Sequence, residues 1–136
     1  MLVIDASVTL SWGLPDERSK EGDLILNRVI DEGAAVPSIW TLEVVNALAV
    51  AERRKRITPD QTQETLTLLR SLQIRLSPSS INSDFGPVMS LARSHSLSAY
   101  DAAYLELAVR DGIPLATFDE PLRRAAEALG VSVLAP

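Results

Sequence analysis

Four acidic residues stand within or at the end of apolar segments of this chain, where a carboxylate without a partner is costly. They are Asp5, Glu43, Asp101 and Asp119. Burying an unpaired carboxylate either destabilises the fold or forces the group to take up a proton. Four such placements in one chain predict that a cation is meant to lie among them.

Ion pairs within a helix do not neutralise Glu43 or Asp101. Residues three and four positions apart are neighbours on a helix surface. All of these neighbours are uncharged: Ile39, Trp40, Asn46 and Ala47 for Glu43, and Leu97, Ser98, Tyr104 and Leu105 for Asp101. Neither acid therefore has a cation within reach on its own helix.

A cluster of carboxylates is typical of a site for Mg²⁺ or Mn²⁺, which are hard ions that take oxygen ligands and several waters. One such ion can generate hydroxide from bound water, and a second, about 3.5–4 Å away, can stabilise the leaving oxygen of a phosphodiester. This chemistry needs no histidine base. It agrees with a chain whose single histidine, His95, lies in a polar stretch.

Local structural roles are the alternative explanation for three of the four acids. Asp101 could close a capping box with Ser98, Asp119 could cap the helix that begins near Pro121, and Asp5 could cap the turn after the first strand. Glu43 has no such role, because its helix neighbours are apolar on both sides. A single shared site explains all four acids together.

Short apolar runs alternate with longer segments of helical periodicity. The predicted strands are Leu2–Ile4, Ala34–Val36, Ile74–Leu76, Pro114–Thr117 and Val131–Leu134. Helices are predicted over Ser19–Glu32, from Pro37 and Ser38 to about Arg56, from Thr58 to about Leu72, and over Phe85–His95, Ser98–Asp111 and Glu120–Gly130. Strands separated by helices of this length indicate βαβ units, and hence an α/β fold with a mainly parallel sheet of about four to five strands.

This fold would bring the acids together. Ligands of open parallel sheets bind beyond the carboxyl ends of the strands. Asp5 and Asp119 each follow a predicted strand, Asp101 lies in the first turn of the preceding helix, and Glu43 lies in the helix after the second strand. The carboxylates should therefore meet at one edge of the sheet.

Length and composition predict one globular domain over residues 1–136, since domains commonly run to about 100–150 residues. No run approaches the roughly 20 apolar residues of a membrane span. Asp5 interrupts the first apolar run too early for a signal peptide, so no membrane association is expected. The chain has no cysteine, which excludes disulfides and thiolate chemistry. A cytoplasmic location is the default expectation.

The net charge of −5 argues against a broad nucleic-acid binder held by phosphate contacts alone. One basic block opposes this trend, with Arg53 and Arg54 at its start and Arg56 at its end. Such a block is typical of a helix C-terminus, where positive charge complements the dipole. Its functional interpretation is a contact with a phosphate or with a partner protein.

Four stretches of the sequence, in this order, resemble the PIN-domain ribonuclease family, and in particular the VapC-type toxins of bacterial toxin–antitoxin pairs. Each stretch contains one of the acids: Val3-Ile-Asp-Ala-Ser-Val8, Thr41-Leu-Glu-Val-Val-Asn-Ala-Leu48, Ser98-Ala-Tyr-Asp-Ala-Ala-Tyr104 and Leu115-Ala-Thr-Phe-Asp119. One motif alone is weak, but four with this spacing are specific. The resemblance extends over essentially the whole chain.

The resemblance implies a three-layer α/β/α fold, a homodimer, Mg²⁺- or Mn²⁺-dependent hydrolysis of RNA, and inhibition by a cognate antitoxin. Asp5, Glu43, Asp101 and Asp119 match the acidic metal-binding positions of the family. Ser7 and Thr117 match polar positions that support the site, while Arg53 and Arg54 would contact substrate or antitoxin. Some relatives carry a further acid after the fourth, a place that Glu120 occupies here.

Two other functions remain as alternatives. One is a catalytically silent module that keeps the fold and binds only a protein partner. The other is a phospho-acceptor domain of the receiver or haloacid-dehalogenase type. That class needs an acidic pair or Asp-x-Asp at the end of the first strand, where Ala6 and Ser7 follow Asp5, and a receiver also needs a late lysine, which is absent after Lys55.

Overall fold

The sheet consists of five parallel strands in the order β3-β2-β1-β4-β5. The structure is a computed structural model, and it describes residues 1–134. The strands are β1 (Leu2–Ile4), β2 (Ala34–Pro37), β3 (Ile74–Ser77), β4 (Leu115–Ala116) and β5 (Val133–Leu134). The predicted α/β class and parallel sheet are confirmed.

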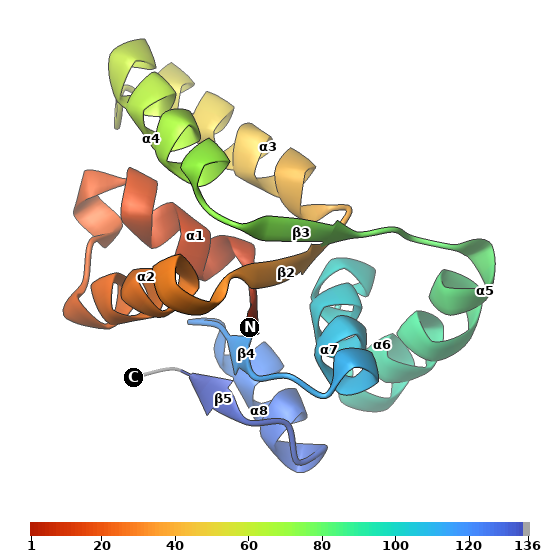
Figure 1. The fold of residues 1–136 in the computed structure, drawn as a ribbon. Helices are drawn as coiled ribbons and strands as arrows, with labels where there is room; N and C mark the ends of the chain where they lie inside the picture. Colours follow the sequence, from red (N-terminus) through yellow and green to blue (C-terminus); the bar gives the residue numbers. More distant parts are fainter. Residues whose placement is uncertain (135–136) are drawn as a thin grey trace.

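Helices cover both faces of the sheet and make the predicted three-layer arrangement (Figure 1). On one side lie α1 (Ala6–Gly13), α2 (Lys20–Glu32), α3 (Trp40–Arg53) and α4 (Pro59–Ser71), with the short 3-10 helix η1 (Pro15–Glu17) between the first two. On the other lie α5 (Ile81–Ser83), the π-helix η2 (Asp84–Val88), α6 (Met89–His95), α7 (Ala99–Asp111) and α8 (Glu120–Ala128). No helix within residues 1–134 is both long and apolar enough to cross a membrane.

The core is built on β1, which is the central strand. Leu2, Val3 and Ile4 are each 0% exposed. Such a strand is apolar throughout because helices cover both of its faces. The carboxyl end of β1 therefore lies in the packed core, next to the ends of β2 and β4.

Helix α1 was not predicted. Its sequence, Ala-Ser-Val-Thr-Leu-Ser-Trp-Gly, is rich in β-branched and hydroxyl residues, which have poor helix propensity. Two tertiary features stabilise it instead: Val8 and Trp12 are buried, and Asp5 caps its N-terminus by accepting a hydrogen bond from the Val8 amide at 3.0 Å.

Several predicted boundaries are wrong by a few residues. Helix α3 begins at Trp40, because Pro37 pairs in β2, and it ends before Lys55, whose φ of 57° is left-handed. The helical region predicted from Phe85 begins earlier, and Pro87 lies in its π-helical part. A proline cannot donate the usual i→i−4 hydrogen bond, which accounts for the irregular turn. The strands β4 and β5 are shorter than predicted.

Candidate functional site

The carboxyl ends of β1 and β4 are joined through the side chain of Asp5. These two strands are direct neighbours in the sheet, with Ile4 paired to Ala116. The Asp5 side chain follows β1 immediately and is 4% exposed. Both of its carboxylate oxygens accept hydrogen bonds, from the Ser7 hydroxyl and Val8 amide on Oδ1 and from the Thr117 hydroxyl on Oδ2.

The two hydroxyls also bind the backbone that leads to Asp119. The Ser7 hydroxyl donates to Asp5 at 2.6 Å and accepts from the Phe118 amide at 3.0 Å. The Thr117 hydroxyl donates to Asp5 and accepts from the Asp119 amide at 2.9 Å. Each hydroxyl therefore connects the first acid to the loop that carries the fourth.

Asp119 is the N-cap residue of α8, as the local alternative predicted. Its Oδ2 accepts a hydrogen bond from the Leu122 amide at 3.0 Å. For α7 the cap is Ser98, whose hydroxyl accepts from the Asp101 amide at 3.1 Å. The capping roles of Asp5 and Asp119 are compatible with a shared site, because each carboxylate oxygen has two lone-pair sites and a capped carboxylate keeps sites for a further ligand.

Glu43 and Asp101 come from the helices on opposite faces of the sheet. Glu43 lies in the first turn of α3 and is partly buried. Its Oε1 accepts a hydrogen bond from the Tyr104 hydroxyl at 2.6 Å. Tyr104 lies three residues after Asp101 on α7, hence on the same helix face. Tyr104 was not among the residues predicted for the site, although its helical spacing from Asp101 is a signal that could have indicated it.

Electrostatic repulsion centres on Asp101. Burial raises the pKa of Asp101, and the negative charges of Asp119 and Glu43 raise it further. Burial likewise raises the pKa of Asp5 from 3.8 to about 6, even though the Ser7, Thr117 and Val8 hydrogen bonds lower it, and the charge of Asp101 adds to the rise. Asp101 therefore interacts with each of the other three acids.

In the described part of the chain, none of these four acids has a cationic partner, although their carboxylates lie close enough to repel one another. Within residues 1–134, none of the four makes an ion pair. The acids that do make ion pairs are Asp16, Glu17, Asp23, Glu32, Glu106, Asp111, Glu120 and Glu127. The cluster is thus an uncompensated concentration of negative charge, which favours binding of a cation.

The donor set fits a hard divalent ion, while the side-chain positions do not yet form a coordination sphere. All four groups are carboxylates, the ligands that Mg²⁺ and Mn²⁺ prefer. In the part of the chain that the structure describes, however, no three Asp, Glu, His or Cys side chains are arranged so that they could hold a metal ion. Like charges without a counterion repel one another, so binding of an ion would have to draw Asp101 and Asp119 toward Asp5 and Glu43, whose carboxylates are held by side-chain hydrogen bonds.

The remaining predicted residues lie away from this cluster. Arg53 and Arg54 are exposed at the far end of α3, about 15 Å along the helix from Glu43 at 1.5 Å per residue. Arg56, in the same basic block, forms ion pairs with Asp16 and Glu17. The structure therefore does not bring Arg53 and Arg54 to the acids.

Glu120 is also separate from the cluster in its interactions. It lies in the first turn of α8 and forms ion pairs with Arg123 and Arg124 on its own helix. These pairs lower the pKa of the Glu120 carboxyl, the opposite of the rise found at Asp5. Glu120 is thus compensated locally, unlike the four acids.

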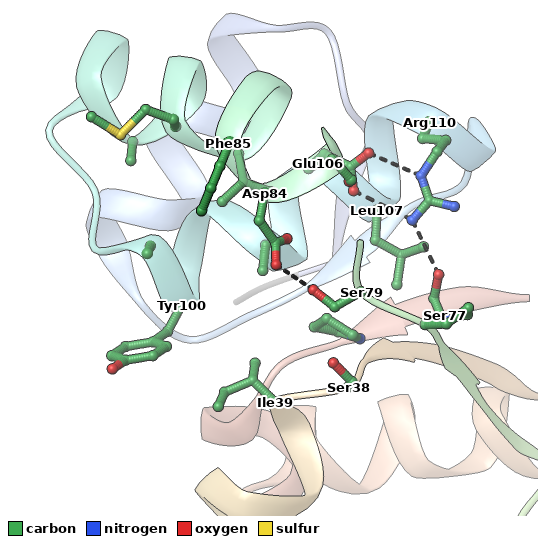
Figure 2. Close-up of a pocket in the computed structure, with 18 of the residues that line it drawn as sticks. Ser38, Ile39, Ser77, Ser79, Asp84, Phe85, Tyr100, Glu106, Leu107 and Arg110 are labelled. Atoms are coloured by element: carbon green, nitrogen blue, oxygen red, sulfur yellow. Dashed lines mark hydrogen bonds and ion pairs between the residues drawn. The ribbon is translucent and has the colours of Figure 1, made fainter. Parts of the chain in front are cut away.

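A pocket of about 630 Å³ lies beside the acid cluster, and none of the four acids lines it (Figure 2). Its wall is mostly apolar, and Leu42 and Tyr100 contribute to it from the positions next to Glu43 and Asp101. At one side Arg110 donates hydrogen bonds to Glu106 and to the Ser77 hydroxyl, as Figure 2 shows. The pocket separates the start of α3 from α7.

Comparison with known proteins identifies a family and a shared fold. The family model described as PIN domain matches residues 2–128. The chain is 29% identical over 128 residues to Ribonuclease VapC3 of Pyrobaculum aerophilum, which covers 94% of this chain and 96% of that protein.

Solved structures also share the fold. PAE2754 of Pyrobaculum aerophilum superposes with a TM-score of 0.72 at 21% identity and covers 98% of this chain and 88% of its own. A structure described as a toxin–antitoxin complex from Klebsiella pneumoniae gives a TM-score of 0.60 at 15% identity and covers 88% of this chain and 87% of its own. At these identities the structures establish a common fold.

Proposed function

Because the chain belongs to the PIN domain family, we propose that it is a metal-dependent endoribonuclease that acts as the toxin of a toxin–antitoxin pair. Its likeness to Ribonuclease VapC3 supports hydrolysis of RNA, and its likeness to the Klebsiella pneumoniae complex supports the toxin role. The observation that carries the proposal is the set of four carboxylates without ion pairs around Asp101.

Asp5, Glu43, Asp101 and Asp119 would hold Mg²⁺, with Mn²⁺ as a substitute. A bound divalent ion supplies a water of lowered pKa and neutralises charge on the phosphodiester during hydrolysis. Ser7 and Thr117 fix both oxygens of Asp5, so that this carboxylate keeps one orientation. Asp101, repelled by Asp119 and Glu43, is the acid whose charge a cation would relieve most directly.

The proposed partners are an RNA substrate, a cognate antitoxin protein and a second copy of the chain in a homodimer. The functional unit would be the single domain of residues 1–136, of which 135–136 lie outside the described residues. Arg53 and Arg54 are exposed and remain candidates for contact with RNA phosphates or with the antitoxin. We also propose a cytoplasmic location.

Cleavage of RNA by the purified, partner-free chain tests the proposal. We expect cleavage with Mg²⁺ or Mn²⁺ and none with EDTA. Asp5→Asn and Asp101→Asn should remain folded and lose cleavage, because each removes one charge from the proposed metal site. Cleavage by both variants at the parental rate would show that the four acids are not the metal site. Addition of the cognate antitoxin should inhibit the parental activity.

A catalytically silent interaction module is the second candidate. It is favoured by the finding that no three metal-binding side chains within residues 1–134 are arranged to hold an ion. A silent module would bind its protein partner without cleaving RNA under any metal condition. The same cleavage experiment therefore distinguishes the two functions. Because the chain belongs to the PIN domain family, we do not retain the phospho-acceptor alternative.

A further inference from the structure

Tyr104 forms the contact between the two helices that carry Glu43 and Asp101. Its side chain is 1% exposed, and its hydroxyl donates to Glu43 Oε1 at 2.6 Å across 61 residues of sequence. Among the described residues, no other hydrogen bond or ion pair joins α3 to α7. This hydrogen bond is thus the one polar contact that the described residues make between the helices that carry the two acids.

Within residues 1–134, Glu43 is held by a side-chain donor alone, whereas Asp5 and Asp119 each accept a hydrogen bond from a backbone amide. Asp5 accepts from three groups, and Asp119 accepts from the backbone amide of Leu122. Among the described residues, the Glu43 carboxylate has Tyr104 as its sole hydrogen-bonding partner. A glutamate side chain also has more rotatable bonds than an aspartate, so an untethered Glu43 would lose more conformational freedom on binding an ion.

Packing between α3 and α7 does not replace this tether. The pocket of about 630 Å³ lies between them, with Ile39 and Leu42 on the side of α3 and Ala103 and Leu107 on that of α7. Ile39 and Leu107 are labelled on its opposite walls in Figure 2. Because open space separates the two helices here, a directional hydrogen bond is needed to hold Glu43 in place.

We propose that Tyr104 is a positioning residue that fixes the Glu43 carboxylate for metal binding through its hydroxyl. The hydroxyl occupies Oε1 and leaves Oε2 for the ion. Partners of this kind orient metal ligands, and their removal commonly weakens metal affinity by about 10–100-fold. This inference rests on the proposed function, since it requires that Glu43 bind a divalent ion.

Mn²⁺ titration of the RNA-free protein by calorimetry tests the inference without using activity. Tyr104→Phe removes the hydroxyl and keeps the ring, so we expect about tenfold weaker Mn²⁺ binding. Tyr100→Phe is the matched control, because Tyr100 is the chain's only other tyrosine and is 58% exposed on the same helix. Tyr100→Phe should bind Mn²⁺ as the parent does.

A double-mutant cycle distinguishes positioning of Glu43 from a general structural role. If Tyr104 acts through Glu43, Tyr104→Phe should cause no further loss of Mn²⁺ affinity in a Glu43→Gln background. An equal loss in that background, or parental affinity of the single Tyr104→Phe variant, would overturn the inference. If Tyr104→Phe does not fold, Glu43→Asp serves instead: it keeps the charge but shortens the reach to Tyr104, and parental affinity there would also overturn it.

Failure of the proposed function gives a different result from failure of this inference. If the parental protein neither binds Mn²⁺ nor cleaves RNA, the metal-dependent function is wrong, and the positioning role with it. If the parent binds Mn²⁺ and cleaves RNA while Tyr104→Phe matches it in affinity, only the role of Tyr104 is wrong. About tenfold weaker binding that disappears in the Glu43→Gln background supports both.

Discussion

The hydroxyl of Thr117 donates a hydrogen bond to Asp5 Oδ2 and links residues that are 112 positions apart in the sequence. Thr117 is 0% exposed and follows β4, while Asp5 follows the neighbouring strand β1. The same hydroxyl accepts from the Asp119 amide, so one side chain fixes two of the four acids. The central part of the site is thus built on adjacent strand ends.

Removing the Thr117 hydroxyl should weaken both the fold and the site. Thr117→Val keeps the shape but leaves the partly buried Asp119 amide and the buried Asp5 Oδ2 each without this partner. An unsatisfied buried group costs about 1–3 kcal/mol, so we expect a loss of that order in the free energy of unfolding. Thr117→Ser is the control and should retain most of the stability. Urea denaturation measures both, and equal stability of the valine variant would contradict the role of the hydroxyl.

Asp5→Asn should abolish cleavage and, at pH 7, relieve the cost of burying the charged Asp5 carboxylate in the metal-free protein. The pKa of Asp5 is raised to about 6, so its charged form is disfavoured in the folded state. A shift of this size corresponds to roughly 2–3 kcal/mol at neutral pH, of which the variant should regain a part. Asp16→Asn is the control: Arg56 lowers the pKa of the exposed Asp16, so no stabilisation is expected there. Because the asparagine NH2 cannot accept the hydrogen bond that one Asp5 oxygen accepts, only a net loss greater than about 3 kcal/mol would contradict the assigned electrostatics.

The raised pKa of the Asp5 carboxyl predicts how the free energy of unfolding changes with pH. Between about pH 4 and pH 6 the folded state binds a proton at Asp5 that the unfolded state has already lost. The free energy of unfolding therefore gains a component that falls as pH rises through this window and stays low above it. Subtracting the curve of Asp5→Asn from that of the parent isolates this component. A difference curve that rises with pH over the window would have the wrong sign.

Divalent ions should stabilise the parental protein and act through Asp101. An ion present at 100 times its dissociation constant adds about 2.7 kcal/mol to the free energy of unfolding. Thermal melts with Mn²⁺ at pH 7.5 should therefore show a higher Tm, and EDTA should reverse it. The effect should decline toward pH 5, because protons compete for the Asp5 and Asp101 carboxylates. Asp101→Asn should show little shift; an unchanged shift would place the ion elsewhere.

The sequence by itself determined which side chains could do chemistry and the class of the fold. Asp5, Glu43 and Asp101 stand out because charge is rare in apolar segments, a property that needs no structure to recognise. The alternation of apolar runs and helical periodicity likewise specified a parallel α/β sheet. Short apolar runs indicate buried strands, and the periodic segments between them indicate helices with one apolar face. Prediction failed where tertiary contacts override helix propensity. Helix α1 is the example, since it depends on its Asp5 cap and on the burial of Val8 and Trp12.

Only the tertiary structure decided how the acids relate to one another. It made Asp101 the acid that interacts with the other three, placed Thr117 on Asp5 and Tyr104 on Glu43, and left Arg53 at the far end of α3. These relationships depend on distances between segments up to 112 residues apart. Side-chain type and spacing specify local conformation, whereas repulsion and hydrogen bonding between distant residues depend on how the helices pack on the sheet.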